Sequence, residues 1–335
     1  MTRVAVLGAG AWGTTLADLL ARKGDDVTLW AREPEVVVGI ERDHVNAVFL
    51  PGAALSPAIR ATNEIATAVR DAEVLVSAAP SHAVRPVMSE AAGAVAGGGG
   101  PLIVSVSKGL EPEQLQPLSC VLAELFGAAA AIAVLSGPSF AEEVYRRQPT
   151  AVVAAARDEA VARRAQQVFA TAQFRVYTAA DVIGVELGGA LKNVIAVAAG
   201  ILEGLGLGYN TRAALITRGL AEITRLGVAL GADPLTFAGL AGMGDLILTA
   251  TGALSRNRSL GVAIGQGRTL EEALAGKQSV AEGVNTARAA VELGRRHGVE
   301  LPIAEQVTEI LFRGKEPRRA IADLMERDLK AEQWR

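Results

Sequence analysis

Six residues near the amino terminus have the spacing of a phosphate-binding loop. Residues 3–7 read RVAVL, and Gly8-Ala9-Gly10-Ala11-Trp12-Gly13 follows at once. In such a GxGxxG turn the first glycine permits a tight turn, the second lets the backbone approach a pyrophosphate, and the third lets the next helix pack closely on the strand. That helix would present free N–H groups to the phosphates. The spacing predicts a dinucleotide site, and the alternative is a structural turn in some other α/β protein.

A lysine and an asparagine interrupt a second, strongly apolar stretch. Residues 185–202 are apolar nearly all round, which predicts a buried helix, and Lys192 and Asn193 lie in its middle. A lysine is seldom buried unless it is paired or used. Because desolvation lowers the pKa of a lysine, such a side chain can donate and recover a proton near neutral pH. We therefore interpret Lys192 as a general acid/base.

The residues one turn earlier on the same helix bear on that interpretation. Glu186 is the expected charge partner of Lys192, and a structural Lys–Glu pair is the alternative to a catalytic role. Gly188 and Gly189 are expected to leave room where a small ligand approaches.

Three further clusters suit a small phosphorylated substrate. Ser255-Arg256-Asn257-Arg258 offers two guanidinium groups, a hydroxyl and an amide. Gly242-Met243-Gly244-Asp245 reads as a flexible turn that presents a carboxylate, and Ser136-Gly137-Pro138-Ser139 as an oxyanion cradle before a helix. Lys108 follows a strand and would face the same crevice. Taken singly, each has a structural alternative: a surface arginine cluster, a turn aspartate, a helix N-cap at Ser139, or a loop lysine.

The elements that must position these residues alternate in the first half of the chain. Apolar strands are predicted at 27–30, 74–78, 102–107 and 132–135, with a helix at 35–42 and an exposed, mobile loop at 97–100. Their continuous apolar character favours a parallel sheet buried on both faces. From residue 181 strand signals end and Ala/Leu/Gly-rich helical stretches follow. The prediction is a Rossmann-like, doubly wound, mostly parallel α/β domain over residues 1–180 and an all-α domain over 181–335.

Composition excludes several classes of protein. The chain has 335 residues, is 50% hydrophobic and carries a net charge of −3, which argues against nucleic acid or an anionic membrane surface as a partner. One cysteine, Cys120, expected to be a buried apolar residue, rules out an internal disulfide, and three histidines make a metal site an unfavoured reading. No signal peptide and no stretch of ~18 apolar residues was found, so we expect a cytoplasmic protein without membrane insertion.

The choice of nicotinamide cofactor depends on the end of the second predicted strand. An acidic residue there would hold the ribose 2′-OH of NAD. Ala31 and Arg32 stand at that place, and Glu33 is expected to point into the next helix. An arginine suits the 2′-phosphate of NADP, although Arg32 also reads as a solvated loop cation. We expect NADP or NAD to be accepted.

The motifs together are similar to one family. GAGAWGTTLA, SKGLE, SGPSFAEEV, LKN, GMGD, SRNR and AEG follow one another in an order that resembles bacterial NAD(P)-dependent glycerol-3-phosphate dehydrogenases, over essentially the whole chain. The resemblance implies interconversion of dihydroxyacetone phosphate and sn-glycerol 3-phosphate, and a supply of glycerol backbone for phospholipids. Independently of it, the apolar character of the helical domain favours a homodimer. The chain departs from the family at Ala11, where serine is usual, and at Glu33, where a basic residue is common.

The resemblance also implies roles for single residues. Lys192 matches the general acid/base. The positions that match substrate contacts are Lys108, Gly137, Ser139, Asp245, Ser255, Arg256 and Asn257. Those that match cofactor contacts, taken with the glycines of the loop, are Gly8, Gly10, Ala11, Trp12, Gly13, Arg32, Lys108, Ala141, Arg256, Val280 and Glu282.

Two other functions remain open on the sequence. A β-hydroxyacid dehydrogenase shares the order of sheet and helices and a helical lysine, but resembles a pattern with asparagine a full turn after that lysine, whereas Asn193 is adjacent here. A non-catalytic redox sensor that binds NAD(P)H would lack the acid or the phosphate-binding cluster, and neither is missing. Substrate-dependent oxidation of NADPH separates a sensor from an enzyme.

Overall fold

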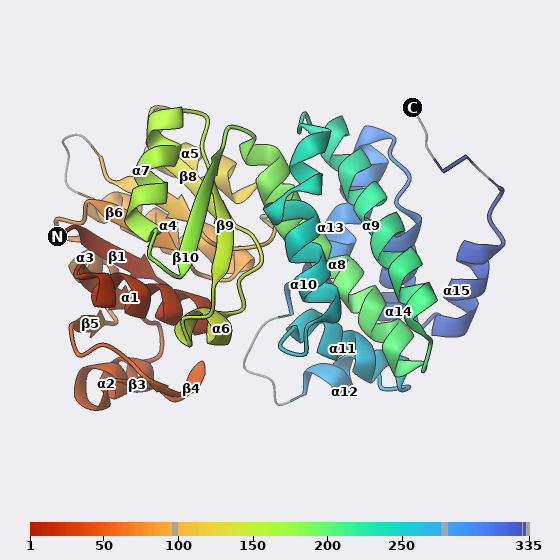
Figure 1. Cartoon of the computed structure of the whole chain (residues 1–335), viewed down its shortest axis with the longest axis horizontal. Coiled ribbons are helices and arrows are strands. Elements are labelled where there is room, and N and C mark those ends of the chain that lie inside the picture. Colours follow the sequence, from red (N-terminus) through yellow and green to blue (C-terminus); the bar gives the residue numbers. More distant parts are fainter. Residues whose placement is uncertain (96–99, 276–280, 330, 333–335) are drawn as a thin grey trace.

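The computed structural model describes residues 1–95, 100–275, 281–329 and 331–332. An N-terminal part built on a sheet of eight strands lies beside a C-terminal part made of helices (Figure 1). The predicted class, a mostly parallel Rossmann-like α/β fold followed by helices, is confirmed. The predicted loop at 97–100 lies almost wholly outside the described residues, and so does Val280.

The sheet places the carboxyl ends of its central strands along one edge. Its order is β10-β9-β8-β7-β6-β1-β2-β5, and every neighbouring pair is parallel except β8 and β9. The strands are β1 (Arg3–Leu7), β2 (Asp26–Trp30), β5 (Ile59–Thr62), β6 (Val74–Ser77), β7 (Leu102–Ser105), β8 (Ile132–Ser136), β9 (Thr150–Ala155) and β10 (Phe174–Ala179). The four strands predicted after β1 are confirmed to within two residues. The sequence analysis missed β5, β9 and β10. The edge strands β5 and β10 mix polar with apolar residues and lack the apolar run of a buried strand, whereas β9 has such a run, TAVVAA, that was not assigned.

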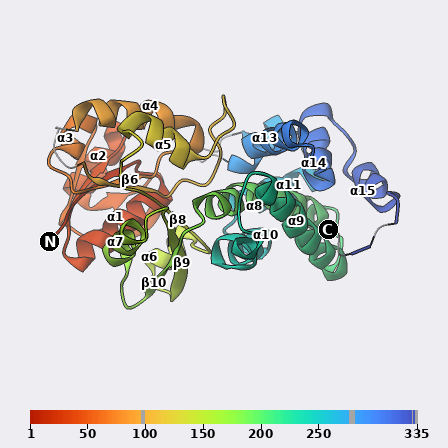
Figure 2. The ribbon, with the colours of Figure 1, turned by 90° about the horizontal axis from the view of Figure 1, so that it is seen from above.

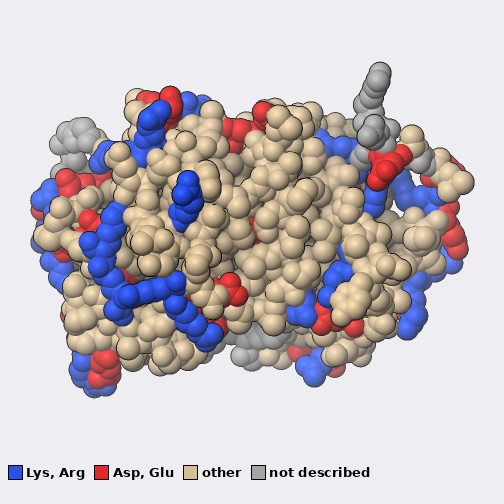
Figure 3. Space-filling model, viewed as in Figure 1, with Lys and Arg blue, Asp and Glu red and all other residues tan. Residues whose placement is uncertain are grey.

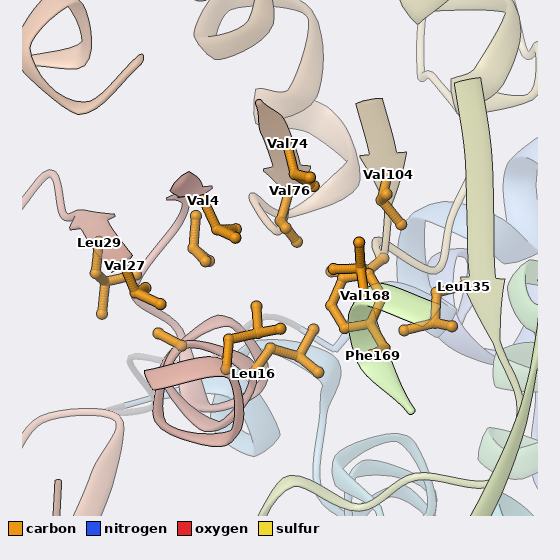
Figure 4. Packing of buried hydrophobic residues seen from close by; sticks show 14 of the residues in the cluster. Val4, Leu16, Val27, Leu29, Val74, Val76, Val104, Leu135, Val168 and Phe169 are labelled. Atoms are coloured by element: carbon orange, nitrogen blue, oxygen red, sulfur yellow. The ribbon is translucent and has the colours of Figure 1, made fainter. Parts of the chain in front are cut away.

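Helices cover both faces of the sheet. One face carries α1 (Ala11–Lys23), α6 (Ala141–Tyr145) and α7 (Glu159–Phe169), and the other α3 (Ile65–Val69), α4 (Ser81–Ala94) and α5 (Leu118–Phe126) (Figure 2). On the first face Leu16 and Phe169 pack against Val4, Val76 and Val104 (Figure 4). This double cover explains why the central strands are apolar without alternation. Beyond β2 lie α2 (Pro34–Asp43) and a hairpin of β3 (Val45–Asn46) and β4 (Leu50–Ala54). Cys120, on α5, is half-buried rather than buried.

The helical part is built around α8 (Val182–Gly204), which is buried over nearly its whole length. Around it pack α9 (Tyr209–Ala229), α10 (Asp245–Thr251), α11 (Arg256–Gly265), α13 (Glu282–His297) and α14 (Pro302–Arg313), with α12 (Leu270–Leu274) and α15 (Pro317–Met325) further out (Figure 1). By length and composition α8 qualifies as a membrane span, so the expectation that no segment would do so is wrong. Because 94% of its apolar window is buried inside the protein, α8 is the core helix of this part.

A single carboxylate anchors the start of α8. Asp181 accepts hydrogen bonds from the backbone N–H of Gly184 at 2.9 Å, from that of Asp233 at 2.9 Å and from the Thr236 hydroxyl at 2.7 Å. The first of these caps the helix N-terminus, and the other two tie it to the segment before α10. The helix that carries Lys192 is thereby held at its entry to the helical part.

Candidate active site

The GxGxxG turn has the geometry that a pyrophosphate requires. Gly8 has φ +127°, and a Cβ there would lie 2.7 Å from the Ala78 carbonyl carbon. A Cβ on Gly13 would lie 1.9 Å from the Gly8 carbonyl oxygen, so this glycine allows α1 to meet the strand. Nothing lies within 4 Å of a Cβ built on Gly10. The turn is therefore tight on its inner side and open where a ligand would approach.

The first turn of α1 leaves its donors for a ligand. The helix begins at Ala11, and no side chain caps it. Its first N–H groups and the positive end of its dipole thus face the open side of Gly10. Among the described residues the buried indole N–H of Trp12 has no hydrogen-bond partner. These observations fit a bound dinucleotide phosphate.

Arg32 lies just past β2, at the place expected to meet the adenosine ribose. Its guanidinium donates to Glu33 Oε1 at 2.7 Å, and its side chain is 82% exposed. Glu33 therefore pairs with Arg32 instead of pointing into α2, contrary to the sequence expectation. The exposed guanidinium is still accessible to a 2′-phosphate, but a carboxylate partly neutralises it.

Ala141 is brought to the same loop by α6. It is the first residue of that helix, and the Thr15 hydroxyl of α1 donates to its carbonyl oxygen at 3.2 Å. The helix N-cap is Phe140, without a side-chain bond, so the alternative role of Ser139 as N-cap is wrong. The Ser139 hydroxyl donates to the Gly137 carbonyl instead, at 2.9 Å.

Two lysines share one buried carboxylate at the carboxyl edge of the sheet. Lys192 Nζ donates to Asp245 Oδ1 and, at 2.8 Å, to the Thr249 hydroxyl. Lys108 Nζ donates to Asp245 Oδ2 at 2.7 Å, to the Gly137 carbonyl at 2.8 Å and to the Ser139 hydroxyl at 3.4 Å. The structure thus brings Lys108, Gly137, Ser139, Lys192 and Asp245 together, as the sequence analysis grouped them.

Burial sets the acidity of Lys192. Its side chain is 6% exposed, and desolvation lowers its pKa to about 7, with the nearby Lys108 adding to the lowering. The charge of Asp245 opposes this by raising the pKa. An ammonium that loses its proton near neutrality is the group the sequence analysis expected.

Two expectations about this cluster are corrected by the structure. Glu186 does not pair with Lys192, because it accepts hydrogen bonds from the backbone N–H of Ser119 at 2.9 Å and from the Ser119 hydroxyl. The GMGD segment is no flexible turn: it is a π-helical turn, Leu240–Gly244, that leads into α10, whose first residue is Asp245. The charge partner of Lys192 is thus 53 residues away in the sequence and rigidly held.

The glycines before Lys192 serve packing. A Cβ on Gly188 would lie 2.7 Å from the Ala241 carbonyl oxygen, and a Cβ on Gly189 would lie 2.7 Å from Ser136 Oγ. Protein atoms therefore fill the space that was expected to admit a ligand. These glycines allow α8 to approach β8 and the segment before α10 closely.

The residues of the Ser255–Arg258 cluster have different structural roles. Ser255 caps α11 by accepting from the Arg258 N–H at 3.2 Å. Asn257 donates to Asn193 Oδ1 at 2.9 Å and accepts from the Gly283 N–H at 2.9 Å, so the amides tie α11 to α8 and α13. The Arg258 guanidinium forms an ion pair with Glu203 at 2.5 Å and is not part of an anion site.

Arg256 is the guanidinium that remains for a ligand. It makes no hydrogen bond to a described residue, and its surroundings lower its pKa mainly through desolvation, opposed by the charge of Glu282. The side chain still reaches solvent. A guanidinium that is accessible to solvent and has no bonded partner among the described residues is suited to a phosphate.

Glu282 joins the helical part to the sheet part. It is the first residue of α13, and its carboxylate accepts from the Ser81 N–H at 3.0 Å and from the Ser81 hydroxyl at 2.5 Å. Ser81 is the first residue of α4, so Glu282 caps that helix. His82 lies at the same helix start, as expected.

Sequence reasoning missed Thr249. Its hydroxyl accepts from Lys192 and donates to the Asp245 carbonyl oxygen at 2.7 Å. The spacing of four residues from Asp245 would have placed both on one face of a helix, but the expected turn at GMGD concealed that relation. Within the described part of the chain, no group of three or more His, Cys, Asp or Glu residues is arranged to hold a metal ion.

Comparison with known proteins agrees with this geometry. Residues 3–162 match the model of the NAD-dependent glycerol-3-phosphate dehydrogenase N-terminus, and residues 181–322 match that of the C-terminus. Glycerol-3-phosphate dehydrogenases [NAD(P)+] of Citrifermentans bemidjiense and Geobacter sulfurreducens are each 55% identical, over 332 and 334 residues; the alignments cover 98% and 99% of this chain and the same shares of theirs. The crystal structure of glycerol-3-phosphate dehydrogenase from Coxiella burnetii superposes with a TM-score of 0.92 at 38% identity, covering 97% of this chain and 98% of that one.

These matches span both halves of the chain, in order, and include the segments that carry the two lysines, the shared carboxylate and the glycine-rich turn. The chain therefore belongs to the NAD-dependent glycerol-3-phosphate dehydrogenase family.

Proposed function

We propose that this protein interconverts dihydroxyacetone phosphate and sn-glycerol 3-phosphate with NADPH or NADH, and that Lys192 is the general acid/base. The observation that carries the proposal is the pair of lysines on Asp245, together with the Arg256 guanidinium, which has no bonded partner among the described residues. Residues 1–180 act as the dinucleotide-binding domain and 181–335 as the helical substrate-binding domain.

The cofactor contacts follow from the turn between β1 and α1. Gly8, Gly10 and Gly13 shape the turn, and the N–H groups of Ala11 and Trp12 hold the pyrophosphate. The other contacts proposed are Arg32, Lys108, Ala141, Arg256, Val280 and Glu282. When bound, the nicotinamide supplies the hydride that reduces the keto carbon.

The proton comes from this chain. As the keto oxygen gains negative charge, Lys192 donates its proton to that oxygen, and in the reverse direction the free amine accepts the proton of the hydroxyl. Asp245 holds both amines in place through its two oxygens, and Lys108 orients the carbonyl together with Asn193. Thr249 fixes the direction of Lys192 Nζ.

The phosphate of the substrate is held away from the reacting carbon. Arg256 and Asn257 bind it, Ser255 sets the start of the helix that presents them, and Gly137 and Ser139 line the other side with Lys108. Binding energy from this remote group orients the keto carbon, so it lowers the activation barrier as well as KM.

The setting proposed for this reaction is the cytoplasm, with the protein acting as a homodimer that provides glycerol backbone for phospholipids. Its partner molecules are the small phosphorylated substrate and the nicotinamide; nucleic acid and stable membrane insertion have no part in it.

The test is a spectrophotometric assay of NADPH and NADH oxidation with dihydroxyacetone phosphate, on the native protein and on Lys192→Ala. Native protein should oxidise the cofactor only when substrate is present, and the variant should lose a factor of about 10²–10⁴ in kcat. Circular dichroism and the Kd for NADPH, both expected to be unchanged, control for folding. Near-native turnover in the variant would remove Lys192 from the proposal, and substrate-independent NADPH binding alone would favour the redox sensor.

A further inference from the structure

A hollow of about 260 Å³ lies on the sheet part, between α1, α6 and the segment that joins α7 to β10. Arg22 and Lys23 line it from the end of α1, Tyr145 and Arg147 from the end of α6, and Phe174 from the start of β10. The volume of the hollow lies just below the ~300–1,000 Å³ typical of small-molecule sites, so it has room only for a small metabolite. None of these residues belongs to the proposed active site.

The lining carries an excess of positive charge. Three cations, Arg22, Lys23 and Arg147, line the hollow with one carboxylate, Asp18, which is already paired with Arg22 Nε at 2.7 Å. Arg22 also donates to the Ala54 carbonyl at 2.8 Å, and Lys23 Nζ donates to the Gln167 and Val168 carbonyls at 2.5 and 2.6 Å, so Arg147 is the main donor left for a ligand. Figure 3 shows Lys and Arg side chains running across the face where α1 and α6 lie. A ligand in the hollow would therefore be an anion.

Arg147 is placed there against its backbone preference. It follows α6 in the left-handed region, with φ +58°, a position where helices usually carry glycine. The left-handed conformation costs a non-glycine residue about 1–2 kcal/mol. Its guanidinium makes no hydrogen bond or ion pair with a described residue, so no internal contact compensates that cost. A strained cation without a partner among the described residues, in the wall of a hollow, is a candidate ligand contact.

Two contacts connect the hollow with the dinucleotide site. Phe174, in the wall of the hollow, lies with its ring centroid 6.3 Å from that of Trp12. Thr15, also in the wall, donates its hydroxyl to the Ala141 carbonyl at 3.2 Å. Trp12 and Ala141 are both proposed cofactor contacts, at the far ends of α1 and α6 from the cations.

We propose that this hollow binds a small metabolite bearing a phosphate or carboxylate group, held by Arg147 with Arg22 and Lys23, and that its occupancy changes the affinity for the nicotinamide cofactor. An anion that joins the ends of α1 and α6 also sets the spacing of their other ends. By linkage, the cofactor changes the affinity for the anion by the same factor. The coupling rests on the proposed cofactor contacts, whereas the anion site does not.

The binding test uses inorganic phosphate and malonate as probes, with chloride at the same ionic strength, in calorimetric titrations of the full chain. Arg147→Gly removes the cation and places glycine where φ is positive, so its Tm should match or exceed that of the native protein. Arg146→Ala is the matched control, because it removes a cation from the same turn that is paired with Glu142 outside the hollow. We expect Arg147→Gly to weaken binding of at least one probe tenfold or more and Arg146→Ala to leave it unchanged.

The two probes distinguish the ligand chemistry. If Arg147→Gly weakens binding of phosphate only, the site takes a phosphate group; if it weakens binding of malonate only, the site takes a carboxylate; if it weakens both, the site accepts either. Isotherms that are the same in all three proteins would place all anion binding in the active site and overturn the proposal. The coupling is tested by the Kd for NADPH without and with saturating probe: a change of fivefold or more is expected, absent in Arg147→Gly. An unchanged Kd would overturn the coupling. A protein that bound no NADPH would count against the proposed function while leaving the anion titration valid.

Discussion

At the scale of single residues, the site depends on one carboxylate that serves two amines. Asp245 is 1% exposed, and each of its oxygens accepts from a different lysine. Burial alone would make Lys192 a weak binder of protons, and the negative charge of Asp245 opposes that effect. The resulting pKa of about 7 lets the same side chain act in both directions of the reaction.

The pH dependence of turnover should report this balance. Reduction requires the ammonium form of Lys192, so kcat for dihydroxyacetone phosphate should fall as pH rises through about 7. Oxidation requires the free amine, so kcat for glycerol 3-phosphate should fall as pH drops through the same range. In Asp245→Asn the negative charge that raises the pKa of Lys192 is gone. The fall in kcat for reduction should then occur at a pH lower by about one unit or more.

The control for that shift is Asp233→Asn, which removes an exposed carboxylate within the helical part that accepts from the Leu235 N–H at 2.9 Å. This variant should leave the pH dependence of kcat unchanged in both directions of the reaction. A pH profile that does not move in Asp245→Asn would show that this carboxylate does not set the acidity of Lys192.

At the scale of elements, the helix that carries Lys192 meets α11, the helix it packs against most extensively, through glycines. A Cβ on Gly200 of α8 would lie 2.0 Å from the Arg258 carbonyl oxygen, and a Cβ on Gly261 of α11 would lie 2.0 Å from that of Val197. Backbone therefore packs on backbone where the two helices cross. This close approach brings Asn257, near the start of α11, within reach of Asn193 on α8.

Gly200→Ala should separate α8 from α11. Because the added methyl group would meet a carbonyl oxygen that cannot rotate away, we expect a loss of about 3 kcal/mol or more and a Tm lower by roughly 5 °C or more. The measurement is thermal unfolding followed by circular dichroism. Gly93→Ala, in α4, is the matched control: nothing lies within 4 Å of its Cβ, so alanine should be neutral or stabilising by about 0.5–1 kcal/mol. Equal Tm values in the two variants would contradict the packing argument.

At the scale of the whole molecule, two carboxylates of the helical part form hydrogen bonds with the sheet part. Glu186 of α8 binds Ser119 near the start of α5, and Glu282 of α13 binds Ser81 at the start of α4. Each accepts from a backbone N–H and a hydroxyl at a helix N-terminus. These contacts tie the helical part to the sheet part at two points.

Glu186 should make stability depend on pH. Desolvation raises its pKa to about 7, above the 4.5 of the unfolded chain, so the folded state binds its proton more tightly. The stabilising contribution is complete below about pH 4.5 and is lost as pH rises through 7, by roughly 3 kcal/mol at the most. Glu186→Gln keeps the shape without the charge, and should flatten the decline in stability between pH 5 and 8.

Urea unfolding at several pH values, native protein against variant, measures that effect. Glu90→Gln changes an exposed carboxylate on α4 and should leave the slope as it is. If Glu186→Gln shows the native slope, ionisation of Glu186 is not what weakens the fold at higher pH.

Much of this protein follows from its sequence because the relevant patterns are local. The glycines of the first turn, the apolar runs of β1, β2, β6, β7 and β8, and the burial of Lys192 are each decided by residues close together in the chain. The motif order also indicated the family. The predictions that failed mostly concerned which side chains bond to each other. Lys192, for example, was expected to pair with Glu186 on the same helix.

Only the tertiary structure decided which groups meet. In the folded chain Lys192 pairs with Asp245, 53 residues away, and Glu186 accepts hydrogen bonds from Ser119, 67 residues away. The tertiary structure also assigned Arg258 to Glu203 and left Arg256 for a ligand. Local patterns determine where a chain forms strands and helices and which faces are buried. The pairing of buried charges depends on how those elements pack, since a charge removed from water takes whichever partner the crossing of helices and sheet brings within hydrogen-bond distance.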